Sequence, residues 1–248
     1  MAVDGRGDHH DRPRALPHVK LVLFDIDGTI LWSDGAGRRA MEGALTEVFG
    51  AAGSPDYRYD GKTDRQIVRD LMRLEGHDDE HIDHQMDVLL DRYLGGLHRE
   101  LAVDERRLHR FPGVIELLDA LEQREDRILG LLTGNLERGA AAKLRAVGID
   151  PARFRIGAFG SDHETRAELP AIAQRRAREV HGLDLPGESI LVIGDTPADI
   201  TCGRPIGARA IAVATGRYSV DELAVHEPYA VFADLTDTAA VVRAIDDA

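Results

Sequence analysis

The sequence lacks several features of secreted and membrane proteins. Its single cysteine, Cys202, cannot form a disulfide within the chain, so a reducing, cytoplasmic setting is expected. No apolar run reaches the ~18 residues that a membrane-spanning helix needs. Residues 1–18 contain no apolar segment of the signal-peptide type, and we expect them to form a disordered tail.

Positive charge is also scarce. The chain has 31 Lys and Arg residues against 44 Asp and Glu, a net charge of −13, and its only lysines are Lys20, Lys62 and Lys143. Such a surface repels nucleic acids and anionic membranes, so we expect neither as a partner. A phosphorylated substrate would have to be attracted by a bound cation or by a few local basic groups.

The chain does contain short apolar runs that alternate with amphipathic helices. In the predicted helix after residue 133, Leu136, Ala140, Leu144 and Val147 share one face, and Gly148 ends the pattern. Alternation of this kind predicts an α/β fold with a parallel sheet covered on both faces. The predicted buried strands are 20–25, 127–133, 189–195 and, more weakly, 209–215 and 229–232.

The alternation is interrupted between about residues 34 and 110. This stretch is typical of several helices, at about 35–49, 63–75 and 80–99, and it has no good buried strand. Phe111-Pro112-Gly113 then restarts the alternation. We therefore predict a catalytic core formed by residues 19–33 and 111–248, with a helical cap domain, residues 34–110, inserted into it.

Polar clusters follow three of the predicted strands: Asp25-Ile26-Asp27-Gly28-Thr29, Thr133-Gly134-Asn135 and Gly194-Asp195-Thr196-Pro197-Ala198-Asp199. Taken singly, each could be a turn or a helix start, and the last could be a capping box with proline at the first helical position. Because ligands of open parallel sheets bind beyond the carboxyl ends of the strands, we expect the three clusters to converge on one site.

The chemistry of phosphomonoester hydrolysis suits these residue types. The carboxylate of Asp25 could attack phosphorus, and Asp27 could protonate the leaving oxygen and later deprotonate water. Magnesium prefers hard oxygen ligands, which Asp25, Asp195 and Asp199 could supply, and it would screen the repulsion between nucleophile and phosphate. The hydroxyl of Thr133 could donate to a phosphoryl oxygen.

The motifs FDIDGT, LLTGN and VIGDTPAD, in this order, resemble the haloacid dehalogenase superfamily over about residues 20–246. The helical insert resembles the cap of phosphoglycolate-phosphatase-like members. The resemblance implies a Rossmann-like core with Asp25 as nucleophile and Asp27 as general acid and base. It also implies Mg²⁺ held by Asp25, the Asp27 carbonyl and Asp195, with Asp199 acting directly or through water. Phosphate would be held by Thr133 and by nearby backbone amides, those of Gly134 and Asn135.

The family's basic residue, normally a lysine, has its best match here in Arg166. A surface arginine paired with Glu164 or Glu168 is the alternative. We expect Arg166 to bind the phosphate and to offset the negative charge between Asp25 and the phosphoryl group. Two other cations are candidates for this role. Lys143 is expected to lie too far away, roughly 15 Å along its helix from the strand end, and Lys62 belongs to the predicted cap.

The sequence thus predicts a magnesium-dependent phosphatase for a small phosphorylated substrate, acting through an aspartyl-phosphate. A sugar-phosphate mutase, which also keeps both aspartates, and a catalytically silent phosphate-binding protein remain alternatives. The physiological substrate is not readable from the sequence, and a monomer and a homodimer are both open.

Three further patterns are weaker. Residues 35–40 fit a dinucleotide fingerprint but do not directly follow a strand, so we expect only a helix start there. Gly61-Lys62-Thr63 resembles part of a P-loop whose first glycine is missing, although Lys62 and Thr63 could still contact substrate. His77, His81 and His84 share a helical face, which favours a polar cap surface over a zinc site.

Overall fold

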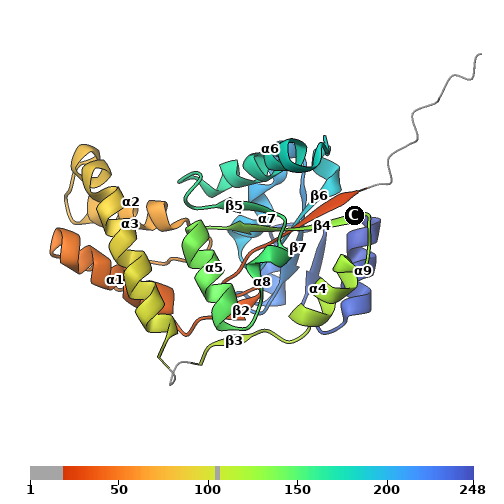
Figure 1. Ribbon diagram of the computed structural model, residues 1–248, viewed down its shortest axis with the longest axis horizontal. Coiled ribbons are helices and arrows are strands. Elements are labelled where there is room, and N and C mark those ends of the chain that lie inside the picture. The colour runs from red at the N-terminus through yellow and green to blue at the C-terminus, as the bar shows by residue number, and fades with distance from the viewer. Residues whose placement is uncertain (1–18, 104–106) are drawn as a thin grey trace, which may run out of the picture.

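The computed structural model describes residues 19–103 and 107–248, so the predicted tail lies outside the described residues. Its core is a six-stranded sheet in the order β5-β4-β1-β6-β7-β8, with parallel pairing throughout (Figure 1). The predicted α/β fold with a parallel sheet is confirmed. The strands are β1 (Lys20–Phe24), β4 (Arg127–Thr133), β5 (Ile156–Phe159), β6 (Ile190–Gly194), β7 (Arg209–Val213) and β8 (Ala230–Phe232).

Helices cover both faces of the sheet. Val22 and Phe24 of β1 pack with α4 (Val114–Glu122), α5 (Glu137–Ala146) and α9 (Thr238–Asp247) on one face. Leu21 and Leu23 pack on the other face with α6 (Leu169–His181) and with Cys202 at the end of α7 (Pro197–Cys202). Because successive strand residues point to opposite faces, a strand covered on both sides must be apolar throughout, which explains the run before Asp25. The short helix α8 (Val220–Ala224) lies beyond β7.

Lys20, the first residue of β1, has a structural role. Its ammonium donates to the carbonyl oxygens of Ile245 and Asp246, at 2.7 and 2.8 Å, in the last turn of α9. Free carbonyls at the end of a helix attract cations, so this contact ties the C-terminal helix to the start of the central strand. It also places one of the three lysines at the edge opposite the polar clusters.

Three helices lie to one side of the sheet in Figure 1: α1 (Ala36–Phe49), α2 (Asp64–Leu74) and α3 (Asp79–Leu101). We call residues 36–101 the three-helix segment. It has its own cluster of buried apolar side chains, including Met41, Leu71 and Leu89. A short antiparallel pair, β2 (Leu31–Trp32) with β3 (His109–Arg110), joins its two connections to the core. The helices fall where the sequence predicts them, while the division into core and cap domain stays a prediction.

The three-helix segment touches the core through the chain just before α2. The amide of Asp64 donates to the carbonyl of Gly134 at 2.8 Å. A Cβ atom on Gly134 would lie 2.0 Å from the carbonyl oxygen of Lys62, so only glycine permits this approach. Gly61 has a left-handed backbone with φ of 71°, and its Cα packs against Ala198. The segment therefore rests on the loops that follow β4 and β6.

Within the described residues, none of the helices combines the length and apolarity needed to cross a membrane.

Candidate active site

The carboxyl ends of β1, β4 and β6 open into one cavity of about 450 Å³. Its lining includes most of the predicted site residues: Asp25, Asp27, Thr133, Gly134, Asn135, Arg166 and Asp195. The expected convergence of the three polar clusters is therefore what the fold produces, because adjacent parallel strands end at the same edge of the sheet. The three-helix segment supplies the opposite wall of this cavity.

Asp25, Asp195 and Asp199 form a compact acidic group at the base of the site. Each is buried, and one carboxylate oxygen from each lies within 4.8 Å of the others. Burial and the nearby carboxylates raise the pKa of Asp25 to about 6 and that of Asp195 well above its usual range, against the opposing charge of Arg166. A divalent cation would remove this repulsion, and a set of hard oxygen donors fits Mg²⁺.

Asp199 is the least available member of this group. Its Oδ2 accepts hydrogen bonds from the amide and the hydroxyl of Thr196, at 3.0 and 2.6 Å, and its Oδ1 accepts one from Arg166. The capping box that the sequence suggested at the start of α7 is present, with Pro197 at the first helical position. Asp25 and Asp195 therefore keep more free lone pairs for a metal than Asp199 does.

Asp195 is enclosed by backbone that comes very close. Its Oδ1 accepts from the hydroxyl of Thr29 at 3.1 Å. A Cβ atom on Gly216 would lie 1.8 Å from its Oδ2, and one on Gly28, whose φ is 87°, would lie 2.3 Å from it. Thr215 donates to the Gly28 carbonyl at 2.5 Å and holds the two loops together. The loop after β7 is thus part of the site, which the sequence alone did not indicate.

Arg166 is buried beside the acidic group, with 6% of its surface exposed. Its Nη2 lies 3.2 Å from Oδ1 of Asp25 and also pairs with Asp199. The alternative of a surface arginine paired with Glu164 or Glu168 is wrong, because the Glu164 carboxylate accepts from Nε of Arg69 at 2.7 and 2.8 Å instead. Arg166 is therefore the cation next to Asp25, in the short turn before α6.

Lys143 also belongs to the site, so the expectation that it lies too far away is wrong. Its Nζ is 2.5 Å from Oδ2 of Asp27 and 2.6 Å from Oδ1 of Asn135. Residues 134–136 are not helical, so only six residues, roughly 9 Å of rise, separate Glu137 from Lys143. A helical side chain also points back toward the N-terminus of its helix, which brings the ammonium to the strand end.

Three donors hold the carboxylate of Asp27: Ser33 Oγ at 3.0 Å, Asn135 Nδ2 at 2.8 Å and Lys143. Burial alone would raise the pKa of Asp27, but the charge and hydrogen bond of Lys143, with the hydrogen bonds from Asn135 and Ser33, bring it below its usual value. Asp27 is therefore an oriented anion in the free protein. The sequence pattern that could have identified Lys143 as a site residue is its position within the apolar stripe of its helix. No sequence pattern singles out Ser33.

Asp64, which the sequence did not single out, is a buried carboxylate at the start of α2. Its Oδ2 accepts from the amide of Leu136 at 2.8 Å, so it links the three-helix segment to the loop after β4. Burial raises its pKa to about 6, although the charge of Lys143 and the hydrogen bonds from Leu136 and Tyr93 oppose the shift. It lines the cavity a short distance from Asp27 and Lys143.

Lys62 and Thr63, the two possible substrate contacts in the segment, have protein partners. Lys62 lines the cavity, but its ammonium pairs with Asp70 at 3.2 Å and bonds to the hydroxyl of Tyr57. Thr63 is buried, accepts from the amide of Gln66 as the cap of α2, and donates to the carbonyl of Glu164 at 2.6 Å. The helix start at residue 63 explains the partial P-loop pattern.

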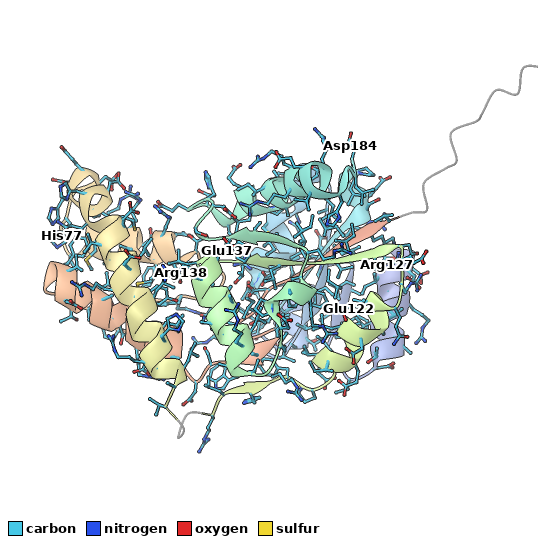
Figure 2. The ribbon with its side chains drawn as sticks, viewed as in Figure 1. His77, Glu122, Arg127, Glu137, Arg138 and Asp184 are labelled. Atoms are coloured by element: carbon cyan, nitrogen blue, oxygen red, sulfur yellow. The ribbon has the colours of Figure 1, made fainter. Side chains whose placement is uncertain are left out.

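The other weak patterns also have structural explanations. Gly35 is the N-cap of α1 and has a left-handed backbone, φ 74°, which glycine adopts without steric cost, so residues 35–40 are a helix start. The rings of His77 and His81 stack at 5.2 Å, and both contact Phe49. Figure 2 places His77 at the end of the three-helix segment remote from the sheet.

Comparisons with known proteins agree with the motifs. The profile of the haloacid dehalogenase-like hydrolases matches residues 22–204. A search of curated proteins gives no match. Among solved structures, a "predicted phosphoglycolate phosphatase" from Haemophilus somnus has a TM-score of 0.66 at 20% identity, covering 92% of this chain and 99% of that one.

Two further solved structures show the same fold. A hydrolase from Pseudomonas syringae has a TM-score of 0.68 at 22% identity, covering 90% of this chain and 98% of its own. A "putative beta-phosphoglucomutase" from Bacteroides vulgatus has a TM-score of 0.64 at 21% identity, covering 92% and 89%. At such identities these similarities speak for the fold alone.

Proposed function

Because the chain belongs to the haloacid dehalogenase-like hydrolase family, we propose that it is a phosphatase that hydrolyses a small phosphomonoester with Asp25 as nucleophile. The proposal rests on one observation: Asp25 and Asp27 both lie at the base of one cavity, and each carboxylate has its own cation. Arg166 lies 3.2 Å from Asp25, and Lys143 lies 2.5 Å from Asp27. One carboxylate is thus poised to attack and the other to transfer a proton.

The first step forms the aspartyl-phosphate. An oxygen of Asp25 attacks phosphorus while the bond from phosphorus to the leaving oxygen breaks, and that oxygen takes a proton from Asp27. The amide of Asp25 is fixed to the carbonyl of Ile193 at 2.9 Å, which holds the nucleophile in place. Arg166 offsets the negative charge that nucleophile and phosphoryl group bring together, and Thr133 donates to a phosphoryl oxygen.

Asp27 must acquire a proton before this step. The dianionic phosphate of a bound substrate raises the pKa of a neighbouring carboxyl group, which opposes the effect of Lys143. In the second step Asp27, now deprotonated, takes a proton from the water that attacks the phosphorus of the intermediate. Phosphate leaves, and Asp25 is regenerated. Ser33, Asn135 and Lys143 keep the carboxylate oriented through both proton transfers.

The acidic group fits the metal that the family implies. Asp25, the carbonyl of Asp27 and Asp195 would hold Mg²⁺, with Asp199 contributing through water because its oxygens are largely occupied. Bound there, the ion would neutralise charge and align the phosphoryl group. The three-helix segment would act as a cap that excludes water from the cavity until the leaving group departs.

The proposal is tested by measuring phosphate release from a broad panel of phosphomonoesters with and without Mg²⁺. We expect turnover that requires Mg²⁺ and disappears in Asp25→Asn, with the fold retained. Activity of Asp25→Asn within tenfold of wild type, or full activity in excess EDTA, would contradict it.

A sugar-phosphate mutase is the second candidate, favoured by the likeness to the Bacteroides vulgatus structure and by the presence of both aspartates. Its products distinguish it: a mutase returns the phosphoryl group to a second hydroxyl of the sugar, so an isomeric sugar phosphate forms instead of inorganic phosphate.

A further inference from the structure

The outer wall of the cavity differs from its acidic base. Trp32 lines the cavity and keeps 45% of its surface exposed, directly after the buried Leu31 of β2. Tyr59 also lines the cavity, and the guanidinium carbon of Arg38 lies 4.1 Å from the centroid of its ring. Met41 and Ile67 complete an apolar surface from α1 and α2. A large indole left open beside an active site offers a face for a planar ligand.

The cavity is also larger than a minimal substrate needs. Its volume of about 450 Å³ lies within the range of roughly 300–1,000 Å³ that encloses ligands of drug size. A phosphoryl group with a two-carbon leaving group would fill only a small part of it. The remaining volume can accommodate a leaving group of ring size.

One cation of the cavity has no acidic partner. Among the described lining residues, four basic side chains already face a carboxylate: Arg166 with Asp25, Lys143 with Asp27, Lys62 with Asp70, and Arg38 with Glu42. Asp60, another acid of the lining, pairs with Arg58 at 3.1 Å. Arg217 is the fifth, and no carboxylate of the described residues lies within ion-pair distance of it. Its charge is therefore available to a ligand.

The backbone around Arg217 is well anchored. The preceding Gly216 lies against Asp195, and Thr215 bonds to the carbonyl of Gly28. On the other side, the hydroxyl of Tyr218 accepts from Arg58 at 3.2 Å, which ties this loop to the three-helix segment. Arg217 also lines the smaller cavity next to residues 55–60, so it stands at the outer edge of the main cavity. Its guanidinium can meet an anionic group at that edge without a large rearrangement.

From these features we propose that the outer cavity is a leaving-group subsite for a phosphomonoester whose alcohol is a planar, mostly apolar ring with a second anionic substituent. The ring lies against Trp32, and the anionic substituent, such as a carboxylate, pairs with Arg217. The inference rests on the proposed phosphatase function and specifies its substrate class. Trp32 then contributes to binding of the ring, and Arg217 contributes to binding of the anionic substituent.

Three phosphomonoesters separate these contributions: 4-carboxyphenyl phosphate has a ring and an anion, phenyl phosphate has the ring alone, and glycerol 3-phosphate has neither. Each variant is compared with wild type on the same substrate, so differences in leaving-group reactivity cancel. Trp32→Ala should lower kcat/KM about tenfold for both ring substrates and less than twofold for glycerol 3-phosphate. Arg217→Gln should lower it about tenfold for 4-carboxyphenyl phosphate alone.

Matched controls are Tyr229→Ala, an aromatic residue 44% exposed outside the cavity, and Arg138→Gln, an exposed arginine at the start of α5 (Figure 2). Neither should change the substrate ratios. If wild type hydrolyses the three esters but Trp32→Ala and Arg217→Gln alter all of them equally, or none, the subsite is refuted while the phosphatase stands. If wild type releases phosphate neither from these three esters nor from any member of the broad panel, the proposed function itself fails.

Discussion

Replacing Lys143 by methionine removes the positive charge beside Asp27 and keeps most of the side-chain volume. Lys143 is 4% exposed, whereas 39% of the Asp27 side chain is open to the cavity. Breaking a fully buried ion pair costs about 3–5 kcal/mol, and an exposed pair contributes less than about 1 kcal/mol. Water reaches Asp27 and screens it in part, so we expect Lys143→Met to lower the free energy of unfolding by about 1–2 kcal/mol.

The effect on catalysis should exceed the effect on stability. Lys143 favours the anion of Asp27, so its removal raises the pKa of that carboxyl group. The limb of the kcat profile that reflects loss of the Asp27 proton should therefore move to higher pH. Asp27 also loses one of its three hydrogen-bond donors and, with it, its fixed orientation. We therefore expect kcat to fall by roughly 10- to 100-fold, while KM stays within about threefold of the wild-type value.

The assay is kcat as a function of pH for wild type, Lys143→Met and a control, Arg145→Met. Arg145 is exposed on the same helix, so its replacement removes one positive charge without touching the site. Lys143→Arg should recover part of the rate, since it restores the charge with a different geometry. An unchanged kcat and pH profile in Lys143→Met, or equal changes in Arg145→Met, would refute the reasoning.

Three further predictions concern the charges around the site. Arg166→Ala should lower kcat by about a hundredfold or more, and Arg166→Lys should recover part of it; a wild-type rate in Arg166→Ala would place the cation elsewhere. Asp195→Ala should weaken Mg²⁺ binding, measured by calorimetry, more than Asp199→Ala does, and the reverse order would contradict the ligand assignment. The pKa of Asp64 is about 6 in the folded protein, above its usual value of 3.8. Ionisation of Asp64 therefore lowers the free energy of unfolding by about 3 kcal/mol. This loss is absent below pH 3.8 and complete above pH 6. Relative to Asp64→Asn, the wild type should therefore lose stability in denaturant titrations as pH rises from 4 to 6, and parallel curves would exclude this shift.

Much of the core can be predicted from the sequence because each strand is recognisable from a few consecutive residues. A strand covered on both faces must be apolar throughout, and residues 21–24 and 190–194 meet that requirement. Since parallel strands end at one edge, the position of Asp25, Thr133 and Asp195 in a single cavity follows from the strand assignments alone.

The rest depends on where side chains of separate elements point. Lys143 could be assigned only with the start of its helix and the direction of its side chain known, neither of which periodicity supplies. The pair between β2 and β3 has only two residues in each strand, too few for a pattern. Trp32 and Arg217 line the same cavity although 185 positions separate them in the sequence, and nothing in either local sequence indicates the other.

The covalent intermediate on Asp25 is the central claim, and it can be trapped chemically. Borohydride reduces an acyl phosphate to an alcohol, which would convert Asp25 to homoserine and lower the mass of the tryptic peptide 21–38 by about 14 Da. That peptide also contains Asp27 and Asp34, so fragmentation identifies the modified residue. The account predicts the loss at Asp25 only, dependent on both substrate and Mg²⁺. Reduction at Asp27, or efficient turnover with no reducible carboxyl group in any peptide, would contradict it.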